Sequence, residues 1–263
     1  MSPWSLSVVR VPCMDEKRAI EIAKSVDQVA VRGAELFLEA ALRSIEDRGR
    51  FTVALSGGSS PLPLFRKIAE QATHWGIDWG AAHVFWADER CVPPDHPDSN
   101  FRMAQELLLS RLPAPGAVIH RIAGELPPKD SAIRYEEDLS LTFGGNELPV
   151  FDMIFLGVGR DGHTASLFPG MEDKGDQGRK AVAMYAENLD SHRVTLTLPV
   201  INNARRVVIM VTGAGKADIV AEILEGKNAW RYPAGRVAPL RGSLTWLLDA
   251  DAGKNLRQFN RKT

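Results

Sequence analysis

The sequence predicts an α/β protein with a Rossmann-like, largely parallel sheet covered by helices on both faces. Two observations carry this prediction. Strand-sized apolar runs recur along the chain at 51–55, 83–87, 151–156 and 207–211, and segments with helical periodicity separate them. Loops rich in glycine or charged residues follow each run. Because strands that alternate with helices form parallel sheets, the helices should cover both faces.

Length and composition are typical of one globular domain, which we expect to span residues 1–263. The chain is 44% hydrophobic and 25% charged, so it can bury a core of ordinary size. Its formal net charge of −1 provides no broad field that would attract nucleic acid or an anionic membrane. The sequence does not define the oligomeric state, and a monomer is compatible with it.

No targeting or membrane segment is indicated. The first 14 residues lack the basic start and sustained apolar run of a signal peptide, and no later run approaches the ~20 apolar residues that span a bilayer. The two cysteines, Cys13 and Cys91, are too few for a disulfide framework or a cysteine-rich metal site. We therefore expect a cytoplasmic protein with free thiols.

The first elements follow from local patterns. From Asp15 to the residue before Gly49, apolar residues recur at helical spacing, which predicts a long helix. The strand at 51–55 is followed by a glycine loop, and a helix is expected to begin near Pro61, where a proline is tolerated. Segment 171–179 is expected to be a mobile surface loop. The other expected elements are helices around 99–112, 129–142 and 215–225 and a strand at 193–198.

The loop after the first strand is a candidate anion site, because ligands of such sheets bind at the carboxyl ends of the strands. Gly57 and Gly58 permit close backbone approach, and the next helix presents unpaired N–H groups and the positive end of its dipole. A phosphate or an anionic sugar oxygen suits this environment. The alternative is a simple strand-to-helix turn, but the position of the loop favours binding.

The second loop, residues 87–100, contains Arg90. The planar guanidinium suits the oxygens of an anion, so we expect Arg90 to bind phosphate or to close the site. Asp95 and Asp98 are interpreted as solvated turn residues. Asp98 or Ser99 is expected to cap the next helix.

The third loop, residues 157–170, contains His163 two residues after Asp161. A neutral imidazole can deprotonate water near neutral pH, and a nearby carboxylate can orient it or stabilise its charged form. The loop also contains a Gly-x-Gly-x-x-Gly sequence. A dinucleotide site is not favoured, because Pro169 would stop the next helix after a turn or two and no acidic residue is placed to bind a ribose. An isolated Asp-Gly-His sequence is mostly a turn, so the catalytic hypothesis depends on its place at a strand end.

The fourth loop, residues 212–217, resembles a nucleotide phosphate loop but fails its spacing. Met210 stands where the first glycine belongs, and Ala217 replaces the hydroxyl that would bind magnesium. Lys216 can still neutralise a sugar phosphate, which carries about −1.5 to −2 charges at neutral pH. Arg193 could join it. The alternatives are a surface lysine and an arginine at a strand end.

Neither a metal site nor a covalent serine mechanism is indicated. His163 has no helical histidine partner, and the Gly-x-Ser-x-Gly nucleophile elbow is absent. We therefore expect direct attack by activated water, with no metal and no cofactor. The histidines interpreted as surface or packing residues are His74, His83, His120 and His192.

Taken together, the motifs resemble those of the 6-phosphogluconolactonase family, in order and over nearly the whole chain. The matching segments are SGGSSP (56–61), WADER (86–90), DSN (98–100), GVGRDGHTASLFPG (157–170), RVTLTLPV (193–200), TGAGK (212–216) and PAGRVAP (233–239). Arg160 departs from the family, in which lactonases often carry an acidic or neutral residue at this position.

The resemblance implies hydrolysis of 6-phospho-D-glucono-1,5-lactone to 6-phosphogluconate, the second step of the oxidative pentose phosphate pathway. The partner would be a small phosphorylated sugar lactone. His163 is expected to be the base and Asp161 its support. The residues expected to bind the substrate and its phosphate are Gly57, Gly58, Ser59, Arg90, Arg193 and Lys216.

Two alternatives remain. Glucosamine-6-phosphate deaminases of the wider superfamily share the glycine loop, the Asp-Gly-His core and the lysine loop. They place a ring-opening glutamate after the histidine, where this chain has 164–169, and a tyrosine at the position of Arg90.

A non-catalytic sugar-phosphate sensor would need an output module, but the chain has no room for a helix-turn-helix before Phe51 and no basic cluster for DNA.

Overall fold

The computed structural model describes residues 9–11, 17–145, 147–170 and 178–257. Cys13, Asp15 and most of segment 171–179, for which a mobile loop is predicted, lie outside the described residues. Within the described part, no helix is long and apolar enough to cross a bilayer.

The main sheet has eight strands among the described residues, in the order β1-β2-β11-β10-β7-β3-β4-β6. Every neighbouring pair is parallel except β1 and β2, so the predicted largely parallel sheet is confirmed. The strands are β1 (Val9–Val11), β2 (Arg18–Ala23), β3 (Phe51–Leu55), β4 (Ala82–Trp86), β6 (Val118–His120), β7 (Met153–Leu156), β10 (Arg206–Val211) and β11 (Ser243–Asp249).

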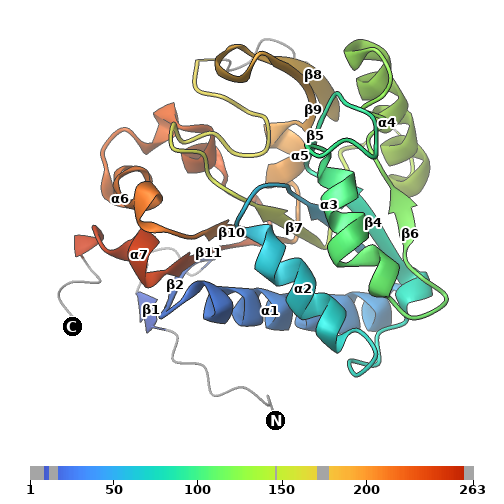
Figure 1. The fold of residues 1–263 in the computed structure, drawn as a ribbon, viewed down its shortest axis with the longest axis horizontal. Coiled ribbons are helices and arrows are strands. Elements are labelled where there is room, and N and C mark those ends of the chain that lie inside the picture. Colours follow the sequence, from blue (N-terminus) through green and yellow to red (C-terminus); the bar gives the residue numbers. More distant parts are fainter. Residues whose placement is uncertain (1–8, 12–16, 146, 171–177, 258–263) are drawn as a thin grey trace.

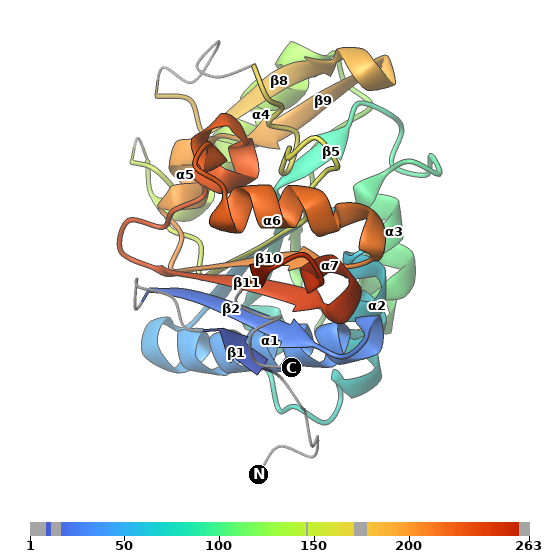
Figure 2. The same ribbon diagram turned by 90° about the vertical axis from the view of Figure 1, so that its left-hand side faces the viewer.

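Helices cover both faces of this sheet, as predicted (Figures 1 and 2). Figure 2 shows α1 and α2 on one side of the strands and α6 on the other. The helices are α1 (Val26–Arg48), α2 (Pro61–Gln71), α3 (Asn100–Leu107), α4 (Pro128–Phe143), α5 (Leu198–Asn202), α6 (Ala217–Glu225) and α7 (Ala250–Gly253).

The predicted helix from Asp15 is wrong in its first part, because β2 precedes α1. Ile20 and Ile22 are buried in the sheet, where β2 pairs with β11 near the other end of the described chain. Helix α1 begins only after Ser25, whose hydroxyl accepts a hydrogen bond from the Gln28 N–H. A six-residue strand whose partner lies so far along the sequence leaves a weak local signal, and the strong periodicity of α1 conceals it.

A second, antiparallel sheet lies beside the carboxyl edge of the main sheet and was not predicted. It has the order β5-β9-β8, with β5 at Asp88–Arg90, β8 at Ala181–Ala186 and β9 at Ser191–Leu196. Ala87 joins the two sheets: its N–H donates to the Leu55 carbonyl, and its carbonyl accepts from the Leu196 N–H, both at 2.7 Å. The strand expected at 193–198 is thus shifted, since Leu198 already begins α5.

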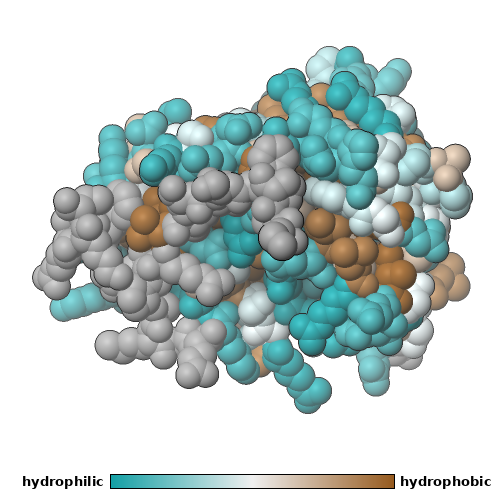
Figure 3. All heavy atoms as spheres, turned by 90° about the horizontal axis from the view of Figure 1, so that it is seen from below, coloured by the Kyte–Doolittle hydropathy of each residue, from teal (hydrophilic) through white to brown (hydrophobic). Residues whose placement is uncertain are grey.

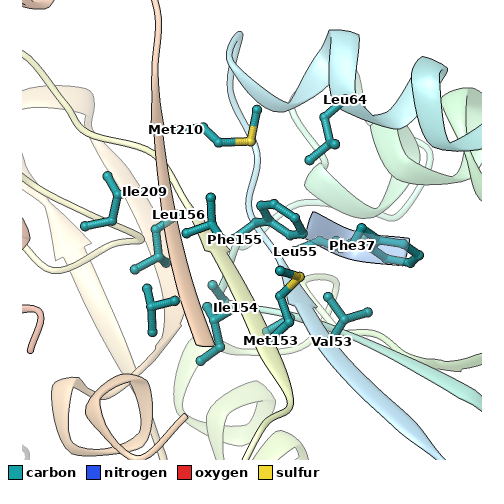
Figure 4. Packing of buried hydrophobic residues seen from close by; sticks show 14 of the residues in the cluster. Phe37, Val53, Leu55, Leu64, Met153, Ile154, Phe155, Leu156, Ile209 and Met210 are labelled. Carbon is teal, nitrogen blue, oxygen red and sulfur yellow. The ribbon is translucent and has the colours of Figure 1, made fainter. Parts of the chain in front are cut away.

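The core between the sheet and α1 and α2 is closely packed (Figure 4). Leu55 of β3 and Phe155 of β7 are at most 1% exposed. Gly33 lets α1 approach, since a Cβ there would lie 3.1 Å from Leu64 Cδ1. Burying a side chain such as Leu64 stabilises the fold by about 1.5–3 kcal/mol. This packing gives the loops at the carboxyl edge a rigid base.

The outer surface has the mixed polarity of an ordinary globular protein. Seen from below, the described residues are mostly hydrophilic, with a group of hydrophobic residues toward one side (Figure 3). Isolated apolar side chains on a surface are normal and need no special explanation. The features that suggest a ligand lie at the carboxyl edge of the sheet.

Candidate active site

A pocket of about 240 Å³ lies at the carboxyl edge of the main sheet, where the loops after β3, β7 and β10 meet β5 and β9. Its volume is slightly below the ~300–1,000 Å³ of drug-sized sites, which suits a small metabolite. Asp161, the remaining predicted site residue, does not line the pocket and instead contacts His163. The predicted residues that line it are Gly57, Gly58, Ser59, Arg90, His163, Arg193 and Lys216.

His163 and Asp161 form a close pair. His163 Nδ1 lies 2.6 Å from Asp161 Oδ1, and the same oxygen accepts from the His163 backbone N–H at 3.2 Å. The imidazole also packs against the Phe168 ring, with centroids 4.8 Å apart. A neutral histidine that donates from Nδ1 keeps a lone pair on Nε2. The pair therefore has the geometry of a general base.

The glycines of the third loop make room for this pair. A Cβ on Gly159 would fall 2.1 Å from His163 Nδ1, and Gly162 has a φ of +82°. Tyr232 packs beneath Gly162, and the Ala234 N–H donates to the Gly162 carbonyl at 3.1 Å. No helix follows directly within 163–170. The Gly-x-Gly-x-x-Gly sequence thus forms the turn that carries His163. The short helix that a dinucleotide site would need before Pro169 is absent from residues 163–170.

The glycine loop after β3 presents backbone donors to the pocket. Among the described residues, the N–H groups of 57–60 have no hydrogen-bond acceptor. Gly58 has a φ of +97°, and a Cβ on Gly57 would fall 1.7 Å from Asn100 Oδ1. Helix α2 begins at Pro61 with no side-chain cap, which leaves its positive end free for an anion.

Arg90 and Arg193 lie side by side as register partners of β5 and β9. Their buried Nε atoms have no hydrogen-bond partner in the described structure. Burial, and then the charge of Arg90, lower the pKa of Arg193 from its ordinary value, while nearby carboxylates such as Asp88 oppose the shift. Two adjacent guanidiniums with unused donors are suited to an anionic ligand.

Lys216 is the last residue of a short 3-10 turn and directly precedes α6. Its Nζ donates to the Val158 carbonyl. Burial lowers the pKa of Lys216, as does the neighbouring Arg160, and Asp161 opposes them. Asp249 fixes the loop, since its two carboxylate oxygens each lie 3.0 Å from the Gly213 N–H.

The sequence did not identify Asp88 and Asn100 as part of the site. Asp88 is 5% exposed and accepts from the Ser166 hydroxyl at 2.7 Å, and Asn100 donates from Nδ2 to the Asp88 carbonyl at 2.8 Å. Asn100 is 2% exposed, and its Oδ1 is buried with no hydrogen-bond partner. The segment 98–100 matches a family motif, and that match was the one available signal.

Glu89 holds the start of α3 in place. Its carboxylate accepts from the N–H groups of Asn100 and Phe101, both at 2.8 Å, and from the Ser99 hydroxyl. Burial raises the pKa of Glu89, and these backbone hydrogen bonds oppose the shift. Ser99 is the cap of α3, as one of the two sequence expectations has it, and accepts from the Arg102 N–H.

No metal cluster accompanies the pocket: the described residues contain no group of three His, Cys, Asp or Glu side chains arranged to hold a metal. His83 and His120 lie elsewhere, with Nδ1 and Nε2 3.0 Å apart, and His120 also contacts Asp138 at 2.9 Å. His120 stacks on Phe85 with a centroid distance of 4.1 Å, in agreement with a packing function.

Fold and pocket together define an α/β protein with a pocket at the carboxyl ends of parallel strands, lined by cationic side chains and a histidine that pairs with a carboxylate. The model of the family described as glucosamine-6-phosphate isomerases/6-phosphogluconolactonase matches residues 24–246. The chain belongs to this family.

Particular relatives make the similarity more specific. The chain is 39% identical over 244 residues to a 6-phosphogluconolactonase of Nostoc, covering 91% of this chain and 99% of the relative. A solved 6-phosphogluconolactonase of Trypanosoma cruzi is 27% identical, covers 90% of this chain and 96% of its own, and superposes with a TM-score of 0.80. A solved monomeric glucosamine-6-phosphate deaminase has a TM-score of 0.74 with coverage of 90% and 99%, but at 18% identity it shares the fold alone.

Proposed function

We propose that this chain hydrolyses 6-phospho-D-glucono-1,5-lactone to 6-phosphogluconate in the oxidative pentose phosphate pathway. The high coverage of relatives named 6-phosphogluconolactonase supports this reaction. The observation that carries the proposal is the His163–Asp161 pair beside a pocket lined by Arg90, Arg193 and Lys216. A base next to several cations suits an anionic ester that water must attack.

The substrate phosphate binds among Arg193, Lys216 and the Gly57–Gly58 loop. The N–H groups of the loop have no other acceptor among the described residues, and each cation is partly buried, which strengthens its attraction for an anion. Binding at this anchor orients the lactone carbonyl beside His163. Arg90 and Ser59 complete the substrate-binding residues of the proposal.

The chemical step is a base-assisted hydrolysis. Nε2 of His163 takes a proton from a water molecule while the water oxygen bonds to the lactone carbonyl carbon. Asp161 holds the Nδ1 proton and stabilises the imidazolium, and backbone or arginine donors stabilise the tetrahedral oxyanion. The intermediate collapses by breaking the bond from this carbon to the ring oxygen, which takes the proton from the imidazolium. The products are a hydroxyl group and a carboxylic acid, which ionises.

Deamination of glucosamine 6-phosphate is the rival reaction. The deaminase-type glutamate is absent from 164–169, where Thr164 and Ser166 are fully buried and use their hydroxyls in structural hydrogen bonds. Lactone hydrolysis needs no such acid. A non-catalytic sugar-phosphate sensor fits less well, because sensing alone does not require the close His163–Asp161 pair.

A paired assay separates these functions. We expect purified protein to accelerate opening of the freshly generated phosphorylated lactone and to release no ammonia from glucosamine 6-phosphate. Ammonia release without lactone opening would identify a deaminase. Binding of 6-phosphogluconate without either turnover would identify a sensor.

The proposal also covers the domain organisation, the cellular location and the cofactor requirement of the protein. A single domain over residues 1–263 is supported by the pairing of β2 with β11, which brings early and late segments of the chain into one sheet. Cytoplasmic location is supported by the low cysteine content, which is typical of a reducing compartment. The hydrolysis is proposed to proceed without a metal or another cofactor, because a lactone is already an activated ester.

A further inference from the structure

Arg160 lies at the pocket although the proposed reaction gives it no function. Its side chain is exposed and lines the pocket next to the catalytic turn, one residue before Asp161. No hydrogen bond or ion pair joins it to another described residue. An exposed arginine without a partner is often only a solvated surface residue. The surroundings of Arg160 decide whether it is such a residue or binds a ligand.

The guanidinium of Arg160 lies along the lysine loop. A Cβ built on Gly215 would lie 3.6 Å from Nη2, 3.7 Å from Nε and 3.9 Å from Cζ of Arg160. These similar distances place the whole guanidinium beside the Gly215 backbone, immediately before Lys216. The side chain therefore extends across the third loop toward the fourth, over the side of the pocket that Lys216 lines.

The positive charges of Arg160 and Lys216 repel each other in this arrangement. The proximity is sufficient for Arg160 to contribute to the lowered pKa of Lys216. Asp161 is the carboxylate that attracts Lys216, and it is already paired with His163 at 2.6 Å. A phosphate carries about −1.5 to −2 charges, so it would relieve this repulsion and match the two positive charges.

We propose that Arg160 is a specificity-determining residue whose guanidinium binds the substrate phosphate together with Lys216. This inference rests on the proposed function for the identity of the anion. This contact would favour phosphorylated over unphosphorylated ligands without participating in the bond changes at the carbonyl.

The test compares wild-type protein with Arg160→Gln, Arg160→Lys and the control Arg43→Gln. Arg43 is 80% exposed on α1 and pairs with Asp47, so its substitution removes the same charge from a helical surface residue that does not line the pocket. Calorimetric titrations use 6-phosphogluconate, gluconate and inorganic phosphate. Steady-state kinetics with the phosphorylated lactone then give kcat and KM separately.

We expect Arg160→Gln to weaken 6-phosphogluconate binding roughly tenfold, since charge-assisted hydrogen bonds have effects of this order. KM for the phosphorylated lactone should rise with little change in kcat, as for a contact made equally in ground and transition states. Arg160→Lys should restore part of the affinity. Gluconate binding should be unchanged by Arg160→Gln, and 6-phosphogluconate binding unchanged by Arg43→Gln.

Equal 6-phosphogluconate affinity in wild type and Arg160→Gln would overturn the inference and leave Arg160 a solvated residue. An equal loss in Arg43→Gln would also overturn it, because the effect would then come from net charge. If the wild type binds 6-phosphogluconate but opens no lactone, the proposed function fails while the affinity comparison still decides the inference about Arg160. No binding of any phosphorylated probe would overturn both.

Discussion

His163 has its position because the glycines of its loop leave space for the imidazole and for Tyr232. A side chain at Gly159 would collide with the imidazole, and one at Gly162 would collide with Tyr232. Asp161 then holds Nδ1 at 2.6 Å. Each of these constraints acts on ring orientation, and none provides binding energy for a phosphate. The residue is thus suited to chemistry more than to anchoring.

We accordingly predict that His163→Ala lowers kcat by about 10²–10⁴-fold, the usual contribution of a general base, while 6-phosphogluconate still binds. Rapid lactone assays and calorimetry on the same preparation check this. A loss of affinity as large as the loss of turnover would show that His163 is an anchor.

The phosphate anchor makes a different prediction, because it depends on the substrate. Lys216→Ala and Arg193→Ala should each lower kcat/KM for the phosphorylated lactone by about ten- to a hundredfold, since charge-assisted contacts contribute about 1.5–3 kcal/mol. The unphosphorylated lactone has no anion to lose and should be little affected. Equal losses on both lactones would contradict the assignment and favour Arg90 as the anchor.

His83 predicts a pH dependence of stability. Burial, then His120 and Arg50, lower its pKa below the ordinary value of 6.5, and Asp138 opposes them. The folded protein therefore favours neutral His83 and binds fewer protons than the unfolded chain between the two pKa values. The contribution of neutral His83 to the stability of the folded protein is fully present above pH 6.5. It is lost as the pH falls through the lower pKa of His83 in the folded state.

We expect the free energy of unfolding to decrease between about pH 7.5 and about pH 5.5, and His83→Asn to reduce that decrease. Urea denaturation at both pH values measures it. His74 is exposed and does not line the pocket, so His74→Asn provides the control substitution. An unchanged pH slope in His83→Asn would contradict the prediction.

At this scale, the sequence predicted seven of the sixteen residues that line the pocket, because each of the seven lies in a recognisable motif. Asn100 was missed because its importance depends on the buried Oδ1, which only the packing against Gly57 reveals. Arg160 was noticed as a departure from the family, but its proximity to Gly215 required the folded loops. Local patterns identify residue types at strand ends, whereas unused donors and acceptors appear only in three dimensions.

Among the elements, β11 has a double function at the site. Its last residue, Asp249, accepts from the Ala252 N–H as the cap of α7 and also from the Gly213 N–H of the lysine loop. One carboxylate thus couples a helix start to the loop that carries Lys216. We therefore expect its replacement to affect both the stability of the fold and the position of Lys216.

We predict that Asp249→Ala lowers the free energy of unfolding by about 1–2 kcal/mol, as expected for loss of a helix cap, and raises KM for the phosphorylated lactone. Asp78→Ala is a matched control: Asp78 also caps a short helix, accepting from the Gly80 N–H at 3.0 Å, and it does not line the pocket. The control should lose stability but keep its KM. A KM increase in both variants would attribute the effect to general loosening.

Element prediction succeeded where the signal was local. The helix expected around 129–142 is α4 at Pro128–Phe143, and the strand expected at 51–55 is β3. Strand β2 was concealed by the helix that follows it, and β5 is only three residues long. Both strands exist because of partners far along the sequence, and no local window contains that information.

For the whole molecule, the site is assembled from loops of one sheet and strands of another. Within the described residues, no group of three His, Cys, Asp or Glu side chains is arranged to hold a metal ion. We therefore predict that activity is unchanged after treatment with EDTA. Initial rates before and after dialysis check this, and inactivation that one metal reverses would contradict it.

The junction at Ala87 has a consequence for the order of folding. The neighbouring strands β3 and β4 are close in sequence, but Asp88 of β5 must find Thr195 of β9 across much of the chain. Closing so long a loop is entropically costly before the main sheet has fixed Leu55, to which Ala87 is bonded. The small sheet should therefore form late and open first in transient local unfolding. Arg90 and Arg193 would separate in such openings, so an anion that bridges them would slow proteolysis and amide exchange in this part of the molecule.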